Sequence, residues 1–165
     1  MMRHSLLPGA LLLVVVVFVA GACGTGQGQP DEAHAEDDEE EAELALHMSR
    51  LQRWTHKTAL ALQARNPELA DFYLHEMEES IETIKTEAPT YEGYAIAEQT
   101  EQLLDPSVEA LDGALDNRNW SAVDARLEEL ARSCNQCHEA TDHGVVKIDL
   151  DDVPNPDPQD FSTDK

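Results

Sequence analysis

The chain has 165 residues, of which 34 are acidic and 11 are lysine or arginine, so its formal net charge is −23. Such an acidic excess argues against nucleic acid or an anionic membrane surface as a partner, and it favours basic partners or cations. The sequence shows no Ser/His/Asp set, no glycine-rich phosphate loop and no carboxylate pair in an apolar setting. We therefore expect no enzymatic activity.

Residues 1–22 have the pattern of a signal peptide. Arg3 supplies a positive start, Leu11–Val19 is an unbroken apolar run, and Ala20–Ala22 is a small-residue triplet. The apolar run is too short for a membrane span, which needs about 20 residues. Because Cys23 follows the triplet directly, the pattern also resembles a bacterial lipobox and predicts lipidation of Cys23. The alternative is ordinary secretion with an incidental thiol.

Either form of processing places the mature protein outside the cytoplasm, in the cell envelope. The lipid on Cys23 would be its only attachment to a membrane. Because Gly24 rather than aspartate follows the cysteine, we expect onward export to an outer membrane where the cell has one. Without the lipid, the protein would be soluble in the periplasm. Residues 23–41 contain "GTGQGQP" and most of an acidic run, so we expect a solvated, flexible tether there.

The following segment, residues 42–143, predicts helices, because its apolar residues recur at helical spacing and nowhere alternate long enough for a strand. The first helix is expected to run from about residue 42 to about residue 63. The second is expected to begin at Asn66, a good N-cap residue that is followed by proline, and to end at Pro89.

Two further helices are expected before the motif-bearing end of the chain. The third runs from about residue 91 to 115, with a new helix start expected at Asp105, and the fourth runs from about 121 to 138. Four amphipathic helices with short connections predict an all-α fold, an antiparallel four-helix bundle. Residues 144–165 are rich in proline and aspartate, so we expect an irregular tail.

The stretch "CNQCHEATDHG" contains the pattern C-x-x-C-H, formed by Cys134, Cys137 and His138. At about 100° per residue, all three leave the fourth helix on its apolar side. The pattern is the attachment site of c-type haem: two thiols add to the vinyl groups, and the imidazole reaches the iron. A zinc site formed by these three residues would need a fourth protein ligand, and only His143 is near in the sequence. A thioredoxin-type redox pair would want a strand–helix–strand context, and a plain disulfide would stabilise little.

A helical chain with this motif at the end of its last helix resembles cytochrome c′ and its low-spin relatives. The chain also resembles a group of small exported bacterial cytochromes over about residues 44–150. Two stretches of sequence carry this resemblance, "MSRLQRWTHKTALALQARNPELADFYLHEMEE" and "CNQCHEATDHGVVKI". The resemblance implies one covalent haem c, with Cys134 and Cys137 as thioether residues and His138 as proximal ligand.

The resemblance leaves the second axial ligand open. Low-spin members of the cytochrome c′ architecture take a methionine from near the start of the first helix, and Met48 has that position here. His56, further around the helix, is the alternative ligand, while His47 falls on the other flank of the apolar stripe. Arg50 and Arg53 are candidate partners for haem propionates, or simply exposed charges that balance the acidic surface.

These features predict a one-electron carrier that exchanges electrons with a redox partner protein bearing a basic docking surface. A first alternative is a five-coordinate haem protein, similar to high-spin cytochrome c′, that binds nitric oxide or carbon monoxide. A second alternative is a helical lipoprotein without haem, whose two neighbouring cysteines form a disulfide.

Overall fold

A computed structural model describes residues 32–151, 153–156 and 158–163, with side chains described from residue 43 onward. The expected signal peptide, Cys23 and Gly24 lie outside this range. The described chain is all-α, as expected, and it contains no strand, only an isolated bridge between Tyr91 and Tyr94. None of its helices combines the length and the apolar character needed to cross a bilayer.

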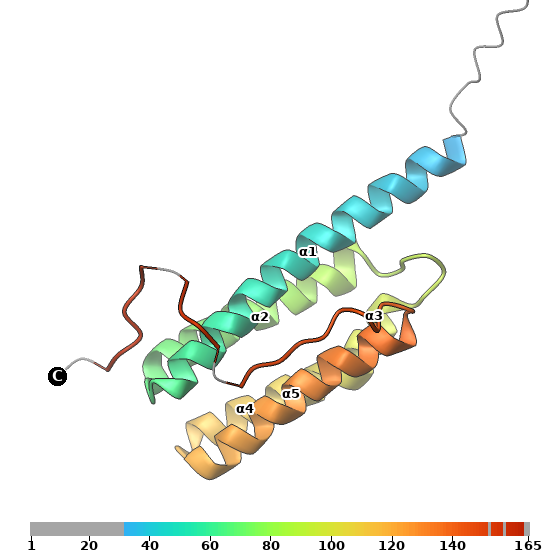
Figure 1. Ribbon diagram of the computed structural model, residues 1–165. Coiled ribbons are helices and arrows are strands. Elements are labelled where there is room, and N and C mark those ends of the chain that lie inside the picture. Colours follow the sequence, from blue (N-terminus) through green and yellow to red (C-terminus); the bar gives the residue numbers. More distant parts are fainter. Residues whose placement is uncertain (1–31, 152, 157, 164–165) are drawn as a thin grey trace, which may run out of the picture. The chain divides into compact units, whose positions relative to one another are not determined.

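The first two helices, α1 (Glu32–Gln63) and α2 (Pro67–Glu87), pack against each other as a helical hairpin (Figure 1). Asn66 caps α2 as expected: its side-chain oxygen accepts a hydrogen bond from the backbone N–H of Leu69 at 3.1 Å. Pro67 follows at the first helical position, where its missing N–H costs nothing. The apolar residues that recur at helical spacing along α2 are buried; they are Ala70, Tyr73, Met77, Ile81 and Ile84.

Helix α1 begins about ten residues earlier than expected. Residues 32–41, for which we expected a flexible tether, are helical in the structure. The segment is rich in alanine and glutamate, which have high helix propensity. A helix that is already nucleated by packing further along gains one hydrogen bond for each residue it adds. The tether expectation is therefore wrong for residues 32–41.

The third helical run begins at residue 96 rather than at residue 91. It consists of α3 (Ile96–Gln99), the π-helical turn η1 (Thr100–Leu104) and α4 (Asp105–Asp116). A tight turn delays its start: Tyr91 and Tyr94 exchange backbone hydrogen bonds of 3.0 and 2.8 Å. Between them, Glu92 and Gly93 have φ values of 48° and 83°, so both lie in the left-handed region that two-residue turns of this kind require.

A new helical element, α4, begins at Asp105 as expected, but it continues from η1 without a break, and Asp105 has helical backbone rather than the conformation of an N-cap. The backbone N–H of Asp105 donates to the carbonyl of Thr100, five residues earlier, instead of to the usual position four residues earlier. Pro106 has no N–H to donate and would crowd a regular α-helical turn. The wider π-helical turn accommodates Pro106 within a continuous helix. From the sequence alone, a proline at this point looks like the first turn of a separate helix.

Helix α5 (Trp120–Ala140) is capped by Asn119, whose side chain accepts from the N–H of Ala122 at 3.2 Å. It packs against α4, and α4 also contacts α2. Val123 and Leu130 of α5 are completely buried. A hydrogen bond of 2.5 Å joins the hydroxyls of Ser107 and Ser133 across the α4–α5 contact.

The C-terminal tail is irregular, as expected, but it packs on the helices. Its first part passes between α1 and α5 (Figure 1), and Leu150 and Phe161 are buried in the core. The Gln63 side chain donates to the carbonyl of Leu150 at 3.3 Å, and the Asn66 side chain donates to the carbonyl of Phe161 at 3.1 Å. The tail therefore supplies part of the core, and one wall of the site described next.

Candidate functional site

The last two turns of α5 present Cys134, Cys137 and His138, and the chain reverses directly after them. The N–H of Thr141 donates to the carbonyl of Cys137 at 3.1 Å, and the N–H of His143 donates to that of His138 at 2.7 Å. Left-handed backbone at Asp142, with φ of 60°, ends the helix between these two bonds. This reversal returns the following residues alongside α5.

The imidazole of His138 is oriented by this returning segment. Its Nδ1 lies 3.0 Å from the carbonyl oxygen of Val146. Because a carbonyl oxygen can only accept, Nδ1 carries the proton and donates it. In the neutral ring, Nε2 is then left with its lone pair. Metal-binding histidines are commonly fixed by a backbone carbonyl in this way.

A cavity of about 360 Å³ lies beside these residues, with walls from α1, from α5 and from residues 146–150. Its volume falls within the range of about 300–1,000 Å³ that is typical of small-molecule sites. Four of the residues singled out from the sequence line it: Met48 and His56 from α1, and Cys134 and His138 from α5. The structure thus brings Met48 and His56 to the cavity that Cys134 and His138 also line.

The two thiols, both free in the structure, face different surroundings. Cys134 lines the cavity, whereas Cys137 lies 3.7 Å from the side-chain oxygen of Gln99 on α3. Burial, with a smaller contribution from neighbouring Cys137, raises the pKa of Cys134 to about 11. Burial also raises the pKa of Cys137 above its ordinary value. Both thiols are therefore protonated at neutral pH, so this pocket does not favour the thiolates that zinc would need.

Met48 and His56 differ in whether the atom that would bind a metal already has a hydrogen-bond partner. The Nε2 of His56 lies 2.8 Å from the carbonyl oxygen of Pro154 in the tail, so this nitrogen carries a proton and donates it. Met48 is half-buried, lines the cavity and packs against the core. Ligation by His56 through Nε2 would break its hydrogen bond to the tail, whereas the described part of the chain has no hydrogen bond that ligation by Met48 would break.

The cavity wall formed by residues 146–150 of the C-terminal tail was not predicted from the sequence. Asn135, between the two cysteines, holds the backbone of Ile148 with two hydrogen bonds: its side-chain nitrogen donates to the carbonyl at 2.9 Å, and its oxygen accepts from the N–H at 2.7 Å. Val146, Ile148 and Leu150 all line the cavity. Their alternation with polar residues is the period-two signal of an extended segment with one apolar face.

The expected propionate partners are not at the cavity. Arg50 and Arg53 are exposed and absent from its lining, and the guanidinium of Arg53 lies 5.4 Å from the ring centroid of Trp54. The cation in the cavity wall is instead Lys147, whose Nζ pairs with Glu139 at 2.5 Å. Lys147 follows the motif closely in the sequence, but only the chain reversal after α5 brings it to the cavity.

The arrangement offers a large ligand two thiols, one oriented imidazole, one thioether and a largely apolar wall. Comparison with known proteins provides no further guidance, because no family model, no curated protein and no solved structure matches the chain.

Proposed function

We propose that the protein is a c-type cytochrome that carries one covalent haem and transfers single electrons in the cell envelope. The observation that carries the proposal is the position of the C-x-x-C-H motif: Cys134 and His138 lie in the wall of a cavity to which α1 adds Met48 and His56. Haem, when bound, supplies an iron that changes oxidation state by one electron. No other group of described side chains offers such a redox centre.

The described residues fit the haem in four respects. Cys134 and Cys137 are free thiols on adjacent turns of α5, and they are available for thioether bonds. His138 has its Nδ1 proton directed to Val146, which leaves Nε2 for the iron. Val146, Ile148 and Leu150 of the tail give the cavity apolar side chains on that side. Lys147 is the cation best placed to pair with a propionate.

We assign the sixth position to Met48, with His56 as the alternative. The thioether is neutral and soft, and Met/His ligation raises the potential of c-type haem, which suits an electron carrier. The arrangement that follows is an antiparallel four-helix bundle in which haem sits at the end of the last helix. The hairpin of α1 and α2 and the contact of α4 with α5 support it.

The net charge of −23 supports a redox partner with a basic docking surface, to which the protein would be steered at low ionic strength. Lipidation of Cys23 would hold the protein on the envelope, with an outer membrane as its destination where there is one. The soluble periplasmic form is the alternative.

Mass spectrometry tests the covalent haem. Protein produced in a host with haem-attachment machinery is expected to show the added mass of one haem, which survives extraction with acidified acetone. Cys134→Ser and Cys137→Ser variants, each with one thiol, would lose or weaken this attachment. An unmodified mass, alongside a control cytochrome that matures normally in the same cells, would contradict the proposal and favour the non-haem lipoprotein.

Carbon monoxide separates an electron carrier from a gas-binding protein. A six-coordinate, low-spin ferrous haem is expected to leave the visible spectrum unchanged when the gas is added. Met48→Ala should then open the iron to carbon monoxide, and His56→Ala should leave it closed. The reverse pattern would identify His56 as the ligand. If the unmodified protein binds carbon monoxide readily, its haem is five-coordinate, and gas binding replaces electron transfer as the favoured function.

A further inference from the structure

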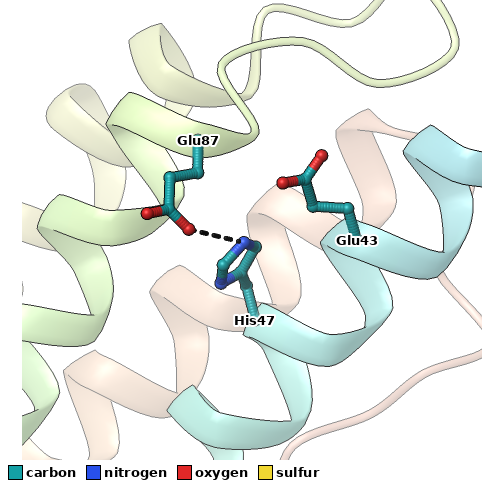
Figure 2. Close-up of side chains that lie close together, drawn as sticks. All are labelled: Glu43, His47 and Glu87. Atoms are coloured by element: carbon teal, nitrogen blue, oxygen red, sulfur yellow. Dashed lines mark ion pairs between the residues drawn. The ribbon is translucent and has the colours of Figure 1, made fainter.

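A second group of ligand-type side chains lies away from the cavity, where α1 meets the end of α2 (Figure 2). Glu43 and His47 are one turn apart on α1, so they project from the same side of the helix. Glu87 is the last residue of α2. One side-chain nitrogen of His47 and one carboxylate oxygen from each glutamate all lie within 4.8 Å of one another.

His47 is the unusual member of this group. Only 5 % of its surface is exposed, and neither ring nitrogen has a hydrogen-bond partner in the described structure. Its Nε2 is directed at Glu87, but the separation of 3.4 Å from the carboxylate oxygen exceeds the usual hydrogen-bond range of about 2.7–3.2 Å. A buried imidazole without a partner is uncommon, because such a polar group loses its contacts with water and gains nothing in return. A ligand bound at Nε2 would remove the deficit of that nitrogen.

The donor set indicates what that ligand is. One imidazole nitrogen and two carboxylates form a typical ligand set for a divalent transition-metal ion, which they hold at about 2.0–2.2 Å. Calcium and magnesium prefer oxygen donors alone. Two carboxylates also neutralise the double positive charge. Glu43 and Glu87 have exposed side chains, so both can rotate by the small amount needed to bring their oxygens closer to Nε2.

We propose that Glu43, His47 and Glu87 bind one divalent transition-metal ion, for which Zn²⁺ is the appropriate probe. The site is separate from the haem site proposed above, since none of its three residues lines the cavity. It joins the start of the packed part of α1 to the end of α2, and it would fix these two helices relative to each other. The proposal does not depend on the presence of haem.

The test is equilibrium dialysis of the full-length mature protein against Zn²⁺ after treatment with a chelator. An excess of Mg²⁺ is present throughout to occupy sites made of carboxylates alone, including any in the acidic run. The wild-type protein is expected to retain one Zn²⁺. His47→Gln and the exposed Glu43→Gln should each weaken its binding by at least ~10–100-fold, the loss that even outer residues of metal sites can cause. Glu101→Gln, a control at an exposed glutamate on η1, should bind as the wild type does.

Two outcomes would overturn the proposal. Equal zinc retention by the wild-type protein and by both ligand variants would show that His47 and Glu87 form an ion pair only. Loss of the bound zinc in a Cys134→Ser/Cys137→Ser variant, with retention in Glu43→Gln, would place the ion on the motif thiols and would also show that these carry no haem. If His47→Gln does not fold, Glu43→Gln decides alone. Anomalous scattering at the zinc absorption edge should place the ion beside His47 Nε2.

Discussion

Replacement of Asn135 by alanine tests how the cavity wall is held. The change removes both hydrogen bonds to the backbone of Ile148, at 2.9 and 2.7 Å. Each such bond contributes about 0.5–1.5 kcal/mol net, so the variant should lose about 1–3 kcal/mol of unfolding free energy. Gln136→Ala, a change at the neighbouring exposed position on α5, is the matched control and should change stability little.

Denaturant unfolding measures this loss, which should appear as a lower midpoint with an unchanged slope. Hydrogen exchange at the Ile148 amide locates it. In Asn135→Ala the amide loses its acceptor and should exchange rapidly. In Asn135→Asp the acceptor remains and the donor is lost, so the amide should stay better protected although the protein is destabilised. Equal protection of this amide in the wild type and in Asn135→Ala would refute the idea that Asn135 holds the tail on α5.

Three further outcomes are expected. Leu150→Ala, at a buried tail position, should cost about 2–5 kcal/mol, measured by chemical denaturation. A loss below about 0.5 kcal/mol would show that the tail is not part of the core. Phe161→Ala should cost about 3–5 kcal/mol by the same assay, since its ring is buried. In protein made without haem, stability should fall as pH rises from 9.0, the ordinary pKa of Cys134, to about 11, its folded value, because the unfolded thiol ionises first. Cys134 should account for about 3 kcal/mol of the decline, so Cys134→Ala should reduce the decline by that amount; Cys137, whose pKa burial also raises, contributes to what remains.

Local signals were sufficient for much of the fold. Asn66 and Pro67 mark the start of α2 through chemistry that involves only the next few residues. The buried stripe of α2 follows from the helical period alone. The same signals correctly predict a new helical element at Asp105, where α4 begins. They do not predict that the π-helical turn η1 leads into it without a break, because aspartate before proline is typical of a fresh helix start.

The site was predictable in its residues but not in its walls. The motif predicts Cys134 and His138 on an apolar side of α5, and both line the cavity. Tertiary contacts set the orientation of the site. The carbonyl of Val146 reaches His138 only because the chain reverses after α5. His56, the alternative ligand predicted from the sequence, also lines the cavity, but its Nε2 hydrogen-bonds to the tail at Pro154, a contact that the sequence does not predict. The period-two alternation of Val146, Ile148 and Leu150 marks an apolar face on the tail, but it does not indicate which helix that face contacts.

His47 and Met48 connect the two proposed sites. They are consecutive residues on α1, so their side chains leave the helix about 100° apart. One is directed to the end of α2 and the other to the cavity. A rotation of α1 about its axis would therefore move both at once. An ion held by Glu43, His47 and Glu87 would oppose that rotation and so restrict the directions open to the thioether of Met48. Because coupling between binding sites is reciprocal, a haem ligand at Met48 would in turn hold His47 in place for the ion.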